Sequence, residues 1–415
     1  MSRAAVDALA GRLRPHYSHF LDRRRDDVLM TGHSHQAWPD VSRDAHLECW
    51  DDAARLADKK WGRIFGEIIP ALQRRIARRI GGDRPADLCF AQSTHELGYR
   101  LASCFPERST VVTTDLEFHS LRRQLDRLEE EGAKIVRVEA GKPGFSARFR
   151  AALAEERPAW AALSLVFFTH AEIVVELPEI LAEAARLGVP LLVDAYHAFN
   201  VVEIDCAGWP GEPFLVAGGY KYAEAGEGAC FMLLPKDAAR FRPKYTGWFA
   251  DFEGLEASNS EPGPVIGGLN PPAGANASRF ATGYASDGGR FFGSTFDPSG
   301  LYRMLRVLEW MDELGLSTSV LRAQSLAQTA LILEAYDALG LAQRGVGLAT
   351  PRDARRAGFV AFTHPQASAL AAALGKVGVM ADARREFLRF GPAPYTQSKE
   401  IDRAMEALAK VSSAR

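Results

Sequence analysis

Several features are scarce or missing in this 415-residue sequence, and each absence excludes a class of protein. No apolar run approaches the length of a membrane-spanning helix, and residues 1–20 are typical of a polar amphipathic helix rather than a signal peptide. The five cysteines form no CxxC pair and no zinc-type spacing, which indicates reduced thiols and no metal site. The formal net charge is only −2, so neither nucleic acid nor an anionic membrane is expected as a partner. We therefore expect a cytoplasmic protein.

What is present is the composition of a soluble globular protein, with 47% hydrophobic and 25% charged residues. A chain of 415 residues exceeds one ordinary core, so about two domains are expected. We predict an N-terminal arm over residues 1–40, a large domain over 41–297 and a small α+β domain over 298–415. Residues 254–289 are rich in Gly, Pro, Ser and Asn, which favours a long loop that covers a site.

Short apolar segments alternate with helical patterns between residues 88 and 234. The predicted strands cover residues 88–91, 110–114, 133–140, 161–168 and 188–193. Continuous apolar strands between helices predict a mainly parallel sheet that is covered by helices on both faces. Ligands bind such sheets beyond the carboxyl ends of the strands. Polar and aromatic side chains gather at these predicted ends, namely Ser93, Thr94, Phe118, His170, Asp194, His197 and Lys221.

Ser93 and Thr94 stand directly before a predicted helix and have two interpretations. A serine there is first of all a helix N-cap, with Glu96 early in the helix. The same geometry also makes a phosphate site, because free N–H groups, the helix dipole and the hydroxyls are directed the same way.

Lys221 lies between Tyr220 and Tyr222 in the glycine-rich segment 218–228. A lysine in such a turn is most often solvated, but a buried lysine loses its proton more readily and forms a Schiff base with an aldehyde. Its companions favour the second interpretation, because pyridoxal phosphate needs a lysine, and an acid against its ring nitrogen. Asp194 is placed to be that acid, His197 to lie near the ring oxygen, and Phe118 to stack on the ring.

Two segments, LVDAYHA (residues 192–198) and GGYKYAEAGEG (218–228), resemble the cofactor motifs of the class V aminotransferase superfamily. These are pyridoxal-phosphate enzymes of fold type I, and the closest resemblance is to kynureninase, in which a tyrosine directly precedes the lysine as Tyr220 does here. Cysteine desulfurases of the superfamily usually have a histidine at that position and a catalytic cysteine in the C-terminal half. This chain has no cysteine after Cys230.

Three later motifs continue the kynureninase resemblance: YTGWF (245–249), RFFGST (290–295) and LRFGPAPY (388–395). They imply that Trp248 contacts the cofactor phosphate and that Thr295 contacts the phosphate of the neighbouring subunit. They also imply that Arg389 binds the substrate α-carboxylate, a role that suits a guanidinium fork. The expected assembly is a homodimer with shared active sites.

The segments expected around the substrate depart from the kynureninase pattern. His33 and Ser34, assigned to substrate binding, lie where kynureninases have GNSLG, and Leu121 replaces an acid. Residues 169–176 also differ. A relative that acts on another amino acid is therefore kept as an alternative.

The resemblance implies a hydrolase in which Lys221 holds pyridoxal phosphate and moves the substrate α-proton. Tyr220 would assist proton transfer, and hydrolysis of the Cβ–Cγ bond of kynurenine or a relative would release alanine and an aromatic acid. The alternatives are a C–S lyase or an aminotransferase on a different amino acid, and a non-catalytic binding relative.

Overall fold

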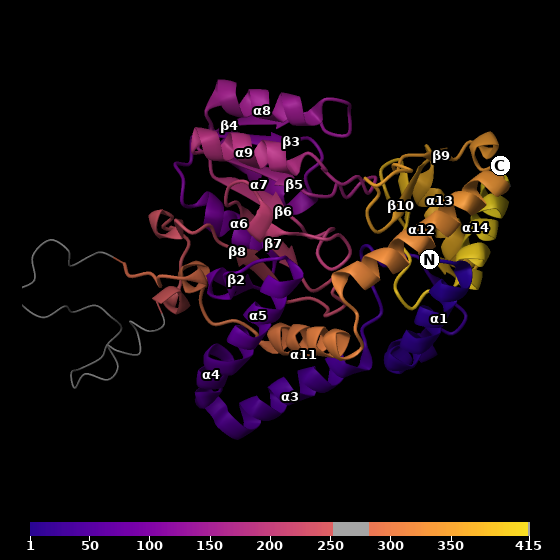
Figure 1. The fold of residues 1–415 in the computed structure, drawn as a ribbon, viewed down its shortest axis with the longest axis horizontal. Coiled ribbons are helices and arrows are strands. Elements are labelled where there is room, and N and C mark those ends of the chain that lie inside the picture. Colours follow the sequence, from indigo (N-terminus) through magenta and orange to yellow (C-terminus); the bar gives the residue numbers. More distant parts are fainter. Residues whose placement is uncertain (252–281, 414–415) are drawn as a thin grey trace, which may run out of the picture.

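The computed structural model describes residues 1–251 and 282–413, so most of the predicted loop 254–289 lies outside the described residues. Figure 1 shows a large α/β part that contains the main sheet and a smaller part that contains the C-terminus. Within the described residues, no helix combines the length and apolar character needed to cross a membrane.

The main sheet has seven strands in the order β2-β8-β7-β6-β5-β3-β4. β8 pairs antiparallel with β2 and β7, whereas the pairs β7–β6, β6–β5, β5–β3 and β3–β4 are parallel. The predicted mainly parallel sheet is therefore confirmed. The strands are β2 (Leu88–Ala91), β3 (Thr110–Thr114), β4 (Lys134–Val138), β5 (Trp160–Ser164), β6 (Leu191–Asp194), β7 (Phe214–Gly218) and β8 (Cys230–Leu233).

Helices lie on both sides of this sheet in Figure 1. The helices that alternate with the strands are α6 (Thr94–Ala102), α7 (His119–Glu130), α8 (Phe145–Glu156) and α9 (Leu177–Leu187). A second group packs together below them: α3 (Asp40–Leu56), α4 (Lys60–Arg63), α5 (Ile69–Arg79) and α11 (Ser299–Glu313). A π-helical turn, Ile64–Ile68, joins α4 to α5.

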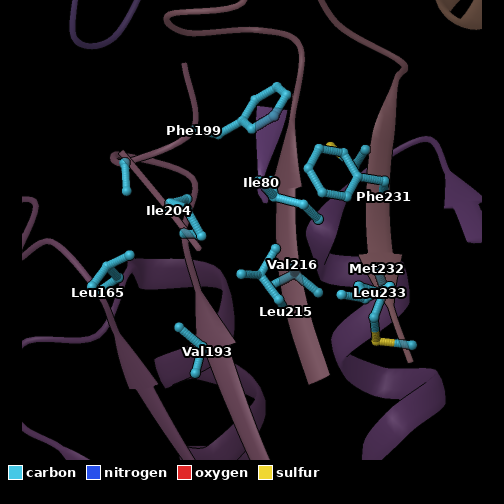
Figure 2. Packing of buried hydrophobic residues seen from close by; sticks show 14 of the residues in the cluster. Ile80, Leu165, Val193, Phe199, Ile204, Leu215, Val216, Phe231, Met232 and Leu233 are labelled. Carbon is cyan, nitrogen blue, oxygen red and sulfur yellow. The ribbon is translucent and has the colours of Figure 1, made fainter. Parts of the chain in front are cut away.

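The core of the large part is formed by the apolar side chains of the sheet. Val193, Leu215 and Phe231 are fully buried on the central strands β6, β7 and β8. Figure 2 shows these side chains with Phe199 and Ile80, which come from segments outside the sheet. Because these strands are buried on both faces of the sheet, their sequences are continuous apolar runs rather than alternating apolar and polar residues.

A second core lies in the C-terminal part. It is built on a four-stranded antiparallel sheet in the order β12-β13-β10-β9. Its elements are β9 (Gly347–Leu348), β10 (Val360–Thr363), β12 (Asp382–Arg384), β13 (Phe387–Phe390), α12 (Thr318–Ala338), α13 (Ala367–Lys376) and α14 (Ser398–Ser413).

The N-terminal arm packs on this C-terminal part. Its elements are α1 (Arg3–Leu13), α2 (Ser18–Leu21) and β1 (Val28–Leu29), and β1 pairs with β11 (Val379–Met380). Val28 and Met30 belong to the second core. The arm then crosses to the large part, where α3 begins at Asp40.

The predicted strand 161–168 is too long, because β5 ends at Ser164. The chain then turns back on itself. Val166 bridges to Ile173, and Ala171 has a left-handed backbone with φ of 63°. The apolar residues continue to Phe168 because the turn is itself buried. The length of the apolar run is therefore greater than the length of the strand.

Candidate active site

A pocket of about 470 Å³ lies at the carboxyl ends of the parallel strands and is lined by residues of both the large and the C-terminal parts. It has the size of an ordinary small-molecule site. Most residues that the sequence assigned to cofactor or substrate line it: Ser34, Ser93, Thr94, Phe118, Asp194, His197, Tyr220, Lys221 and Arg389.

Lys221 lies three residues after the end of β7, and its side chain is buried. Its Nζ lies 2.9 Å from Nε2 of His197 and 5.2 Å from the centre of the Phe118 ring. Burial lowers the pKa of Lys221 to about 7; the charge of Asp194 opposes this shift and that of Arg389 adds to it. The amine is therefore substantially unprotonated near neutral pH, which makes it nucleophilic.

Asp194 is the last residue of β6. Its Oδ1 accepts a hydrogen bond from the Tyr196 amide at 2.8 Å, and no other hydrogen bond to this carboxyl is seen among the described residues. Burial raises its pKa, while the Tyr196 amide and the charge of Lys221 counteract the shift. A half-buried carboxyl with so few donors favours a protonated nitrogen beside it.

His197 lies in the turn that follows β6 and contacts Lys221 with both ring nitrogens, at 3.1 and 2.9 Å. Burial lowers its pKa well below the usual range, and the charges of Lys221 and Arg389 add to this effect. His197 is therefore a neutral imidazole that can donate one hydrogen bond and accept another.

Ser93 caps α6, because its hydroxyl accepts a hydrogen bond from the Glu96 amide at 3.3 Å. The N-cap interpretation of the sequence is thus confirmed. Thr94 is the first residue of α6 and, like Ser93, lines the pocket. The positive end of the helix dipole therefore faces the same pocket as Lys221, although the phosphate role stays a prediction.

Arg389 lies on β13 and is almost fully buried. Its Nε donates to Oδ1 of Asp382 at 3.0 Å, its Nη2 donates to Oδ2 of Asp382, and its Nη1 donates to the Phe168 carbonyl at 2.6 Å. A guanidinium has five N–H donors, so two remain for a ligand once the contacts with residues 1–251 and 282–413 are counted. The sequence did not identify Asp382, which no nearby motif distinguishes.

His33 does not line the pocket but supports this ion pair. Its Nε2 lies 2.9 Å from Oδ1 of Asp382, and its ring stacks on Phe359 with 4.6 Å between ring centres. Burial lowers the pKa of His33 to about 4, with a further contribution from the charge of Arg389, so His33 is neutral and donates to Asp382. The position assigned to substrate binding thus contacts the residue that holds Arg389.

Trp248 and Thr295 are not brought into this pocket. Nε1 of Trp248 donates to Oγ1 of Thr295 at 3.3 Å, and Trp248 is 44% exposed. Their contact with a cofactor phosphate therefore stays a prediction.

His170 does not belong to the site, contrary to the expectation from its place after a strand. Its ring contacts Thr169 at 2.8 Å and Glu172 at 3.1 Å. The early end of β5 places it in the buried turn that follows.

Glu117 is a buried carboxyl beside the site that the sequence motifs did not identify. It accepts hydrogen bonds from the hydroxyls of Thr114 at 2.6 Å and Ser164 at 2.7 Å, and from the Ser164 amide at 3.0 Å. Burial raises its pKa to about 7, and nearby Asp194 adds to the shift. The sequence did contain a signal for Glu117, because it directly precedes Phe118 shortly after the end of β3.

These side chains fit pyridoxal phosphate on chemical grounds. The pocket combines a buried amine, an acid for a protonated ring nitrogen, an aromatic ring and a helix N-terminus for a phosphate. A metal site is not formed by residues 1–251 and 282–413, where no group of three or more His, Cys, Asp or Glu side chains is suitably placed.

Comparisons with known proteins agree with this arrangement. Residues 321–408 match the model of the kynureninase C-terminal domain. The fold matches a cystine C–S lyase, C-DES, solved with its product cysteine persulfide, with a TM-score of 0.76 and 15% identity over 94% of this chain and 99% of that one.

Two further solved structures share the fold. An apo cysteine desulfurase from Thermococcus onnurineus has a TM-score of 0.76 and 15% identity, with 97% of this chain and 99% of that chain covered. An alanine–glyoxylate aminotransferase from Nostoc sp. has a TM-score of 0.63 and 17% identity, with 93% and 95% covered. No curated protein sequence matches the chain.

The predicted fold type I architecture is therefore confirmed, and the kynureninase resemblance is confirmed for the C-terminal segment. Residues 321–408 thus match the kynureninase C-terminal domain, and the chain shares its fold with a cystine C–S lyase, a cysteine desulfurase and an alanine–glyoxylate aminotransferase.

Proposed function

We propose that this protein is a pyridoxal-phosphate-dependent enzyme that acts on an L-amino acid. The observation that carries the proposal is the buried Lys221 amine, whose pKa is lowered to about 7, in one pocket with Asp194, His197 and Phe118. A non-catalytic relative would have no need to keep a buried, partly deprotonated lysine, which costs stability.

The pocket residues divide into three groups by the part of the ligands that they would contact. Ser93, Thr94 and Tyr220 would hold the phosphate, whereas Phe118, Asp194 and His197 would hold the ring. Arg389 and Ser34 would contact the substrate. In this assignment residues 41–297 bind the cofactor, and residues 1–40 and 298–415 complete the substrate site.

Pyridoxal phosphate supplies an aldehyde for amines and a ring that accepts electrons from the substrate α-carbon. The chain supplies the rest. Asp194 keeps a proton on the ring nitrogen by charge attraction, and Lys221 takes up and returns the α-proton because its amine exchanges protons near neutral pH. Tyr220 assists this transfer, and the two free N–H groups of Arg389 orient the α-carboxylate.

The reaction we favour is hydrolysis of the Cβ–Cγ bond of kynurenine or a related amino acid, which releases alanine and an aromatic acid. The match of residues 321–408 to the kynureninase C-terminal domain supports this choice, since Arg389 and Asp382 lie in that segment. Tyr220 directly before Lys221 also supports it.

A β-position C–S lyase is the second candidate. The fold is shared with a cystine C–S lyase, of which a Lys→Ala mutant carries glycine covalently linked to its pyridoxal-phosphate cofactor. Leu121, where kynureninases have an acid, also favours a substrate other than kynurenine.

We further propose a homodimer in which the active sites are shared. Apolar side chains that a partner subunit would cover are exposed on the described surface; they include Trp50 and Leu47 on α3 and Tyr245 and Trp248 near the predicted phosphate motif. Light scattering after size-exclusion chromatography should give twice the mass of one chain.

The deciding experiment mixes the cofactor-loaded protein with kynurenine, cystine and cysteine conjugates and identifies the products. Alanine with an aromatic acid supports the hydrolase, and pyruvate with a released sulfur species supports the lyase. No product and no spectral change with any amino acid would refute the enzyme assignment.

A further inference from the structure

Tyr196 lies in the pocket wall between Asp194 and His197, and none of the roles above uses it. Its ring centre is 4.4 Å from Nζ of Lys221, closer than the Phe118 ring at 5.2 Å. The amine that would bind the cofactor therefore has two aromatic rings as neighbours.

Gly218, the last residue of β7, makes room for this ring. A Cβ atom on Gly218 would lie 2.7 Å from the Tyr196 hydroxyl oxygen and 2.5 Å from Sγ of Cys230, closer than real Cβ contacts. The hydroxyl in turn lies 3.6 Å from Sγ of Cys230. The Tyr196 ring thus lies across the end of β7, and any side chain at position 218 would displace it.

We propose that Tyr196 is a second aromatic contact for the cofactor ring, in addition to Phe118. The inference rests on the proposed function, because it concerns the ligand of Lys221. Aromatic pairs contribute about 0.5–1.5 kcal/mol beyond their buried area, which corresponds to a roughly 2- to 13-fold change in affinity. The aromatic face, rather than the hydroxyl, carries this contribution.

The test measures the dissociation constant of pyridoxal phosphate from the apo-protein, and the visible circular dichroism of the loaded protein. Tyr196→Leu, which keeps bulk but removes the aromatic face, should raise the dissociation constant about 2- to 13-fold and change the dichroic band. Tyr196→Phe should stay within twofold of wild type. Tyr222→Phe is the matched control, since Tyr222 follows Lys221 in the chain and is buried, but it does not line the pocket.

Gly218→Ala provides an independent variant, because it leaves Tyr196 present but displaces its ring. It should weaken cofactor binding as Tyr196→Leu does. The melting temperatures of the apo-proteins identify any variant that fails to fold.

Each outcome bears on one proposal. If wild type takes up no pyridoxal phosphate on Lys221, the proposed function fails. If wild type binds it but Tyr196→Leu binds equally well or more tightly, with an unchanged dichroic band, the role of Tyr196 is refuted while the proposed function stands.

Discussion

Lys221 is a base that the fold keeps partly unprotonated at neutral pH, and this affects the stability of the folded protein. Its pKa is about 7 in the folded protein, against about 10.4 for an unperturbed lysine. Between these values the unfolded state binds more protons, so stability rises with pH across this window. Lys221 therefore lowers the free energy of unfolding most at neutral pH and below.

Replacing Lys221 by Met should therefore stabilise the apo-protein. We expect a gain of roughly 2–4 kcal/mol in the free energy of unfolding at pH 7, which shrinks as the pH approaches 10. Denaturant titrations at several pH values measure it. An equal gain in the free energy of unfolding at pH 7 and pH 10 would contradict the lowered pKa of Lys221.

Arg389 should affect the substrate far more than the cofactor. Arg389→Lys keeps the charge but loses the fork that contacts Asp382 and the Phe168 carbonyl. We expect about 30-fold weaker amino-acid binding or more, with cofactor affinity nearly unchanged. Spectral titration with L-alanine measures the amino-acid affinity. Arg352→Lys is the control, because Arg352 forms an exposed ion pair with Asp337. Equal losses of both affinities would refute the assignment.

The loop after β7 contains another buried acid, Glu224. It accepts a hydrogen bond from the Tyr17 hydroxyl, and its amide donates to the Lys221 carbonyl at 3.0 Å. Burial raises the pKa of Glu224 to about 8, and the Tyr17 hydroxyl opposes the shift. The folded state then binds more protons than the unfolded state between about pH 4.5 and 8, so stability falls as pH rises through this window.

Glu224→Gln should remove that pH dependence. We expect melting temperatures close to wild type at pH 5 and higher than wild type at pH 9, because the amide carries no charge to bury. Thermal scans at both pH values check this, with Glu227→Gln, from the same loop, as the control. A variant that is less stable than wild type at pH 9 would contradict the account.

At the scale of elements, the sequence predicted what depends on local pattern. The predicted strands over residues 88–91 and 110–114 agree with β2 and β3, since each is a short apolar run bounded by polar residues. The overlong strand at 161–168 shows the limit, because a buried turn is as apolar as a strand. Asp382 was missed for a related reason: its role depends on pairing with Arg389 across β12 and β13.

At the scale of the whole molecule, the two ends of the chain lie in the same part of the structure (Figure 1). Asp7 on α1 accepts hydrogen bonds from the Ser398 amide at 2.7 Å and hydroxyl at 2.6 Å. Arg14 pairs with Glu400 at 2.9 Å. The arm therefore holds α14 in place while its later residue Ser34 lines the pocket.

Deleting residues 1–16 should thus destabilise the C-terminal part first. It removes buried Val6, Ala10 and Leu13 and leaves Ser398 and Glu400 without these partners. Limited proteolysis should cleave the truncated protein earliest between residues 318 and 413. Asp7→Asn is a milder variant for comparison, because it changes only the acceptor of the Ser398 hydrogen bonds. Unchanged cleavage in the truncated protein would contradict a stabilising role for the arm.

The measurement that tests the central claim most directly is chemical labelling of Lys221. The protein is incubated with pyridoxal phosphate, reduced with borohydride and digested, and its peptides are analysed by mass spectrometry. The account predicts a visible absorption band that borohydride bleaches and a pyridoxyl group on the peptide that contains Lys221, both lost in Lys221→Ala. A colourless protein, or a label on other lysines only, would contradict it.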